Sequence, residues 1–235
     1  MRAFPLRAAI AAAGLAILGL LYLVAADAPQ SGDAGQARID EAIAAYASQI
    51  RAEQEAASDA AVARMAGALL RDPATPVLGN PEGDVAVIEF FDYTCAFCKA
   101  AEPRLRAFVE EDGGVKLVLK DFPILTPESV IASKAALASV RQGKFESFHH
   151  ALIDLSGQLS EARIFATAES VGLDVERLRE DMKAPEIADQ IIANFNLARS
   201  LRVTSTPTFI IDEHLVTQPS AEIDFPRTIA AARAG

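Results

Sequence analysis

The stretch VAVIEFFDYTCAFCKAAEPRLRAFVEE, residues 85–111, places a dithiol where an apolar strand gives way to a helix. Cys95 and Cys98 are the only two cysteines of the chain, and they open the helical part. A helix N-terminus presents unpaired N–H groups and the positive end of the helix dipole, so it lowers the pKa of a thiol from about 8.5 toward roughly 3.5–7.5. We therefore expect Cys95 to attack disulfides and Cys98 to resolve what Cys95 has attacked.

The residues around the dithiol predict a β-α-β unit. The near-continuous apolar run at residues 85–93 indicates a central strand that is buried on both faces. The helix at 98–111 is followed by Gly113 and Gly114, and VKLVLKDF at 115–122 has the pattern of a second strand. Such units are right-handed and parallel in nearly all known cases.

Beyond this unit the pattern changes to helix and then returns to strand. Residues 127–201 are helical in pattern, with stops that predict four or five short helices. Strand character returns at TPTFIID, residues 206–212, and a last helix is expected at about 224–232. The sequence thus predicts an α/β domain that is interrupted by an all-helical insertion.

The N-terminal segment has the pattern of an export signal. Arg2 and Arg7 precede an apolar run at residues 8–24, and small residues follow up to Ala26. We expect residues 1–26 to be a signal peptide, or a retained anchor that tethers the protein to the inner membrane. Both alternatives place the rest of the chain in the periplasm, where two thiols form either a structural disulfide or a redox pair. A Cys-x-x-Cys loop is too short to join distant elements, which favours the redox pair.

A helical extension precedes the α/β domain. Residues 27–35 are small and polar and predict a flexible link, and residues 37–71 carry apolar positions at helical spacing that indicate two modest helices. The whole segment 27–72 is thus a linker with a helical extension, and the domain is expected at 73–235. Two alternatives stay open for residues 37–71: a helix packed on its own domain, or a stalk for homo-oligomerisation.

The overall charge limits the class of partner. The chain of 235 residues has a formal net charge of −10, which disfavours nucleic acid and anionic lipid as partners. No metalloprotease, nucleophile-elbow or phosphate-loop motif is present in the sequence.

Two motifs together resemble a known family. FFDYTCAFCK, residues 90–99, followed by TSTPTFII at 204–211, is similar to the DsbA-like thiol-disulfide oxidoreductases. The resemblance covers about residues 73–215 and implies a thioredoxin-like fold with an inserted helical subdomain. The helical extension and the FHHAL segment are similar to the secreted ScsC-like branch, some members of which oligomerise through that extension.

The resemblance assigns roles to residues of the site. It makes Cys95 the exposed nucleophile, Cys98 the buried resolving thiol and Pro207 a cis-proline that faces them. Thr206 would flank the reactive sulfur, with its backbone free to pair with an extended client segment. Phe97 would offer apolar surface to that client. The uncharged pair Ala96 and Phe97, in place of the Pro-His pair of DsbA itself, implies a less oxidising couple.

The resemblance also points to a buried acid. Glu89 lies within the apolar strand, where a carboxylate is costly unless it is paired or protonated. We expect it to exchange a proton with Cys98 through water, and Lys120 on the neighbouring strand is a possible partner in that transfer. The alternative is an acid at a sheet edge that touches solvent.

The expected function is disulfide exchange in client proteins that contain cysteines, reset by a membrane redox partner. No organic cofactor or metal is expected, and the redox group is the Cys95–Cys98 pair itself. Isomerase or reductase activity is slightly favoured over oxidase activity. The alternative is a periplasmic copper-binding protein whose dithiol holds the soft metal. His149, His150 and His214 are expected to be structural or solvent-facing, with His214 in a loop after the last strand.

Overall fold

The computed structural model describes residues 32–216 and 219–234, and the expected signal peptide or anchor at 1–26 lies outside them. Helices and strands follow one another as α2 (Gly32–Leu70), β1 (Val77–Gly79), β2 (Val85–Phe91), α3 (Ala96–Asp112), β3 (Val115–Asp121), α4 (Pro127–Ser139), η1 (Val140–Gln142), α5 (Phe145–Ile153), α6 (Glu161–Ser170), α7 (Val175–Asp181), α8 (Pro185–Ser200), β4 (Thr208–Ile211), β5 (His214–Leu215), η2 (Ser220–Glu222) and α9 (Phe225–Ala234). Among these described residues, no helix is long and apolar enough to cross a membrane.

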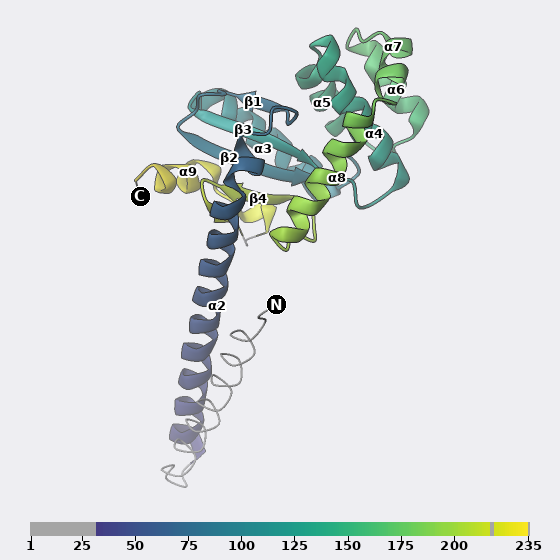
Figure 1. The fold of residues 1–235 in the computed structure, drawn as a ribbon. Coiled ribbons are helices and arrows are strands. Elements are labelled where there is room, and N and C mark those ends of the chain that lie inside the picture. The colour runs from purple at the N-terminus through teal and green to yellow at the C-terminus, as the bar shows by residue number, and fades with distance from the viewer. Residues whose placement is uncertain (1–31, 217–218, 235) are drawn as a thin grey trace, which may run out of the picture. The chain divides into compact units, whose positions relative to one another are not determined.

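The five strands form one mixed sheet in the order β1-β3-β2-β4-β5. β2 pairs in parallel with β3 and antiparallel with β4, so the strand before the dithiol is central, as its apolar run predicts. The short strands β1 and β5 add antiparallel edges that the sequence pattern did not predict. The helices α4 to α8 lie between β3 and β4 in the sequence, and they form a helical insertion in a thioredoxin-like fold (Figure 1).

Two apolar cores cover the two faces of the sheet. One core holds Val87 and Phe91 of β2 together with α3, α9 and most of the helical insertion. The other holds Ile88 and Phe90 with the end of α2 and the end of α8. The alternation of side chains along β2 determines which residue faces which core. Burying one Val, Leu, Ile or Phe side chain stabilises the fold by about 1.5–3 kcal/mol, which favours this register.

The helix α2 corrects two expectations about the extension. It is one continuous helix rather than two, and it begins at Gly32, inside the segment 27–35 that was expected to be a flexible link. Alanine is the best helix former, so the alanine-rich middle continues the helix instead of breaking it. The compact unit that contains the sheet begins at Glu55, so it includes the C-terminal part of α2.

This helix has two stripes of apolar side chains, a first with Ile39, Ile43 and Tyr46 and a second with Val62 and Leu69, and they differ in exposure. Val62 and Leu69 are 2% and 1% exposed and belong to the core beside α8, so this stripe of the helix is not free for the predicted contact between copies. Ile39, Ile43 and Tyr46 are 38%, 57% and 41% exposed. The alternative of a helix packed on its own domain is therefore correct for the second stripe.

Candidate active site

The dithiol sits at the first turn of α3, where the sequence predicts it. Cys95 is the N-cap residue, and its Sγ accepts a hydrogen bond from the Cys98 N–H at 3.4 Å. The Cys95 N–H in turn donates to the Asp92 carbonyl at 3.0 Å, which closes the turn that follows β2. An N-cap side chain satisfies one of the N–H groups that a helix leaves unpaired, and here the cap is the reactive sulfur.

The two thiols differ strongly in acidity. The pKa of Cys95 is lowered to about 6, chiefly by the Cys98 thiol and further by Thr206 and the N–H groups of Cys98 and Phe97, while burial opposes the shift. The pKa of Cys98 is raised far above its ordinary value by burial, by Cys95 and by the charge of Glu89. At neutral pH the first sulfur is therefore a thiolate and the second a thiol.

Cys95 is less exposed than a free nucleophile was expected to be. The residue is only 4% exposed. Its Sγ lies 3.2 Å from the Thr206 carbonyl oxygen, to which the thiol donates a hydrogen bond when it is protonated. The segment before β4 thus lies directly against the sulfur.

The peptide bond between Thr206 and Pro207 is cis, and both residues are partly buried. The Thr206 hydroxyl is buried and has no hydrogen-bond partner among the described residues. Thr206 flanks the Cys95 sulfur through its carbonyl group, as the resemblance implied. A hydroxyl group at this position can donate a hydrogen bond to a thiolate.

Glu89 is buried within β2, 3% exposed, and points to the face that α3 covers. Its ladder partners Leu119 and Phe209 both belong to the core that contains the dithiol. Burial raises the pKa of Glu89 well above its ordinary value, and the charges of Glu102 and Cys95 raise it further. The carboxyl group therefore holds a proton at a pH where a surface glutamate has lost it.

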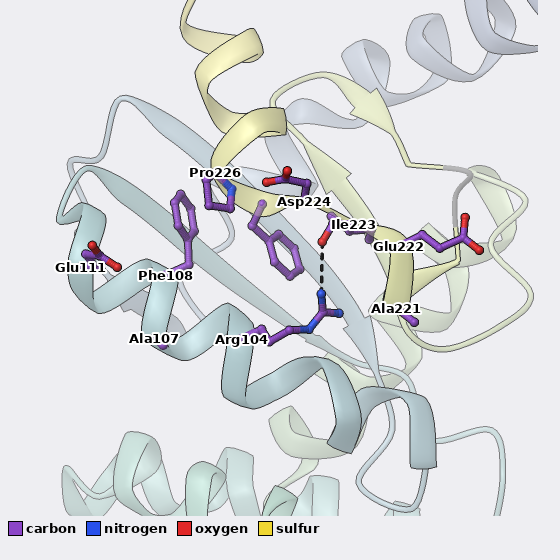
Figure 2. A pocket seen from close by; sticks show the side chains of 10 residues that line it. Arg104, Ala107, Phe108, Glu111, Ala221, Glu222, Ile223, Asp224 and Pro226 are labelled. Atoms are coloured by element: carbon purple, nitrogen blue, oxygen red, sulfur yellow. Dashed lines mark hydrogen bonds between the residues drawn. The ribbon is translucent and has the colours of Figure 1, made fainter.

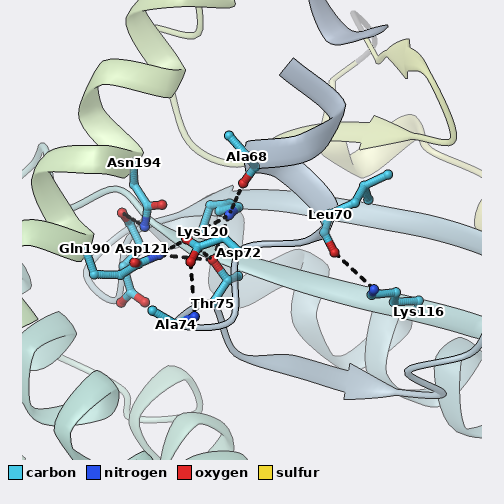
Figure 3. Close-up of polar contacts among 10 residues, drawn as sticks. All are labelled: Ala68, Leu70, Asp72, Ala74, Thr75, Lys116, Lys120, Asp121, Gln190 and Asn194. Carbon is cyan, nitrogen blue, oxygen red and sulfur yellow. Dashed lines mark hydrogen bonds and ion pairs between the residues drawn. The ribbon is translucent and has the colours of Figure 1, made fainter. Parts of the chain in front are cut away.

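Lys120 does not pair with Glu89, and the expected partnership is wrong. The register pairs Glu89 with Leu119 and Phe90 with Lys120, so the two charged side chains leave the sheet on opposite faces. Lys120 Nζ instead donates to the Ala68 carbonyl at 2.9 Å and to Thr75 Oγ1 at 2.7 Å (Figure 3). It holds the end of α2 to the sheet, and burial lowers its pKa to about 8.

Exposed apolar side chains lie in the active-site turn and in the loop that Asp92 holds beside it. Phe97, between the two cysteines, is 67% exposed, in keeping with the surface that it was expected to offer. Ile124 and Leu125, in the loop after β3, are 36% and 52% exposed. Their backbone N–H groups both donate to Asp92 Oδ2 at 3.0 Å, which holds this loop beside the turn that carries Cys95.

Asp92 is a site residue that the sequence reasoning missed. It is fully buried, and besides the loop after β3 it accepts hydrogen bonds from Thr94 N–H at 2.7 Å and Ser129 Oγ at 2.7 Å. It therefore joins the active-site turn to the start of α4. The sequence feature that could have identified Asp92 is its position directly after a buried strand and three residues before Cys95.

The histidines differ in part from expectation. His149 is buried and His150 is partly buried, so only one of the adjacent pair faces the core, as expected. His214 lies in strand β5 instead of a loop, and its Nδ1 is 2.9 Å from Asp59 Oδ2. That contact joins β5 to α2.

A pocket lies between α3, η2 and the start of α9 (Figure 2). Phe108 and Phe225 line it, and Arg104 crosses it to donate to the Ile223 carbonyl at 3.3 Å. It contains none of the predicted site residues.

Curated relatives match this chain as one part of larger proteins. It is 31% identical over 138 residues to the Na(+)/H(+) antiporter NhaA 3 of Salinispora tropica, which covers 58% of this chain and 21% of that protein. The corresponding protein of Herminiimonas arsenicoxydans is 26% identical over 151 residues, 61% of this chain and 24% of the relative. The chain thus spans about a fifth to a quarter of the length of these relatives.

Solved structures match nearly over their full length. A thioredoxin-like oxidoreductase from Silicibacter pomeroyi has 41% identity and a TM-score of 0.68, with 72% of this chain and 98% of that chain covered. The thiol-disulfide exchange protein alpha-DsbA2 from Wolbachia pipientis has 26% identity and a TM-score of 0.69, covering 77% and 98%. The catalytic domain of Proteus mirabilis ScsC, at 22% identity, TM-score 0.67 and coverage of 75% and 99%, shows the shared fold.

The family model described as thioredoxin matches residues 71–231, which contain the sheet, the dithiol, the helical insertion and the cis-proline segment. This match covers more than half of the chain and agrees with the arrangement of the DsbA-like structures. The chain therefore belongs to the thioredoxin family and has the DsbA-like form of its fold.

Proposed function

We propose that this chain is a thiol-disulfide oxidoreductase that exchanges disulfides with client proteins. One observation carries the proposal: the capping sulfur of Cys95 has a pKa of about 6, whereas the pKa of Cys98 behind it is raised. Such an asymmetry separates an attacking thiolate from a resolving thiol that stays neutral until it is needed. The thioredoxin-like oxidoreductase and alpha-DsbA2 support the same class of reaction.

The proposed reaction balances without a cofactor. The Cys95 thiolate attacks one sulfur of a client disulfide, forms a mixed disulfide, and releases the other client sulfur as a thiolate that takes up a proton. Cys98 then loses its proton and attacks Cys95 Sγ, which releases the second client sulfur and closes the Cys95–Cys98 disulfide. The client disulfide is reduced by two electrons while the dithiol is oxidised. In the reverse direction the same steps oxidise a client.

Glu89 is the proposed proton acceptor for the second step. Its carboxyl group faces the core that holds Cys98, and its raised pKa makes its ionised form a stronger base than a surface carboxylate. Transfer through a water molecule would let Cys98 ionise only when the mixed disulfide has formed. Lys120, on the other face of the sheet, takes no part in this step.

The finer description of the activity is also a proposal. We infer an exported, periplasmic protein from the signal pattern at residues 1–26, with a membrane redox partner that resets the dithiol. The uncharged pair Ala96 and Phe97 and the exposed apolar residues of α2 favour an oligomeric isomerase or reductase over an oxidase. Client recognition is assigned to Thr206, Pro207 and the apolar side chains of Phe97, Ile124 and Leu125.

The test compares two serine variants in reduction of a model disulfide substrate. Cys95→Ser should lose catalysed reduction completely, because no thiolate attacks. Cys98→Ser should accumulate mixed disulfides with the substrate, which non-reducing electrophoresis resolves. An active Cys95→Ser protein would refute the proposal. The equilibrium potential of the wild-type couple in glutathione buffers then decides the direction of electron flow.

A further inference from the structure

A buried cluster of one carboxylate and two imidazoles joins α3 to α5. Glu102 lies one turn after Cys98 on α3, and His149 and His150 are consecutive residues of α5. Nε2 of His150 is 3.6 Å from Glu102 Oε1, and Nε2 of His149 is 3.9 Å from Glu102 Oε2. Each residue offers one ligand atom, and the three atoms lie within 4.8 Å of one another.

His149 is held with one ring nitrogen free. Its Nδ1 is 2.9 Å from the hydroxyl oxygen of Tyr93, while its Nε2 is buried and has no hydrogen-bond partner among the described residues. Phe145 stacks on the ring and Phe91 meets it edge to face. Metal-binding histidines characteristically hydrogen-bond through the nitrogen that does not bind the metal, which fixes the ring and its tautomer.

A plain ion-pair network explains this cluster poorly. At 3.9 Å the His149 Nε2 is beyond hydrogen-bond distance of Glu102, so a buried polar atom would stay unsatisfied at a cost in free energy. Arg106 contacts Glu102 at 3.8 Å through Nε, yet its Nη2 donates to both oxygens of Asp154 at 3.0 Å. The guanidinium group is thus engaged mainly outside the cluster.

We propose that Glu102, His149 and His150 form a binding site for a divalent transition-metal ion of the zinc class, separate from the dithiol. A tetrahedral ion with bonds of roughly 2.0–2.1 Å holds its ligand atoms about 3.3 Å apart. The separations of 3.6 and 3.9 Å, each to a different oxygen of Glu102, and the 4.8 Å limit on the three ligand atoms exceed that value, so the side chains must draw together to hold the ion. The His150 side chain is 19% exposed and gives the ion a path from solvent and a fourth position for water.

The site would tie the helix that carries the dithiol to the helical insertion. Two nitrogen donors and one oxygen donor distinguish it from the soft sulfur site that the copper alternative requires. The inference does not depend on the proposed disulfide exchange, because none of its three ligands is a cysteine. A failure of either proposal leaves the other intact.

The test uses the full chain with Cys95→Ser and Cys98→Ser, so that sulfur cannot bind the added metal. Titration with Zn²⁺ by calorimetry should give one ion per chain. Titration with Co²⁺ should give the visible bands of a tetrahedral ion without sulfur charge-transfer absorption. Absence of binding in this background, or binding that requires the cysteines, overturns the proposal.

Four variants in the same background locate the ion. Glu102→Gln and His150→Gln should each weaken Zn²⁺ binding at least about tenfold, whereas His214→Gln, which alters an exposed histidine elsewhere, should leave it unchanged. Arg106→Gln removes the cation that competes for Glu102 Oε1 and should tighten binding several-fold. A gain of affinity cannot result from misfolding. Equal affinity in all four variants would place the ion elsewhere and refute the assignment.

Discussion

Removal of the Cys98 thiol should raise the pKa of Cys95. That thiol is the largest contribution to the lowered pKa of Cys95, about 6 against an ordinary 9.0. A hydrogen bond to a charged acceptor contributes about 1.5–3 kcal/mol, and one pKa unit corresponds to about 1.36 kcal/mol. Cys98→Ala should therefore raise the pKa of Cys95 by roughly one to two units, to about 7–8. Cys98→Ser keeps an O–H donor and should titrate near or below the wild type.

The assay is the ultraviolet absorbance of the thiolate and the rate of alkylation, each followed against pH in the reduced proteins. The midpoint, not the rate at one pH, is compared, because the nucleophilicity of a thiolate changes with its own pKa. In the wild type only Cys95 titrates in this range, since the pKa of Cys98 is raised far above it. If the alanine and serine variants share one midpoint, the Cys98 thiol is not the cause. A wild-type midpoint near 9.0 would remove the helix-cap explanation as well.

Three further outcomes are expected. Glu89→Gln should slow the release of mixed disulfides while leaving the first attack by Cys95 intact, as measured by rapid acid quenching and electrophoresis; an unchanged release rate would exclude the proton role. Burial raises the pKa of Asp121 from 3.8 to about 7, so the wild type loses stability as the pH rises through that window, by at most about 4 kcal/mol. Asp121→Asn should thus be more stable than the wild type above pH 7 in denaturant unfolding, with a difference that disappears below the ordinary pKa. Ile43→Lys should dissociate any oligomer in sedimentation velocity, and Ala45→Lys, on the other side of the helix, should not; identical profiles that are both monomeric reject the stalk.

The sequence was sufficient for the elements that are long and strongly patterned. The strand at Val85–Phe91, the helix that follows the dithiol, and the helical insertion all carry many residues that report the same period. Strands β1 and β5 have three and two residues, which is too few for any alternation to be recognised. The continuous helix α2 was divided in two because its alanine-rich middle has no apolar face, although alanine needs none to remain helical.

The site was predictable where neighbours in sequence are neighbours in space. Cys95, Cys98 and the helix start lie within one turn, so their geometry could be expected from spacing alone. The cluster of Glu102 with His149 and Tyr93 comes from α3, α5 and the turn after β2, and nothing in the spacing of these residues brings them together.

Pairing in a sheet explains why the two buried charges were wrongly joined. The sequence placed Glu89 and Lys120 on neighbouring strands, and a shift of one residue in register would have set them side by side. In the observed register they face different cores, so the lysine cannot balance the glutamate or carry its proton. Any proton that Glu89 gives up must therefore leave on the side of α3, where Cys98 is buried. The sheet thus separates two tasks: one face holds the reacting groups, and the other uses Lys120 to fasten the end of α2.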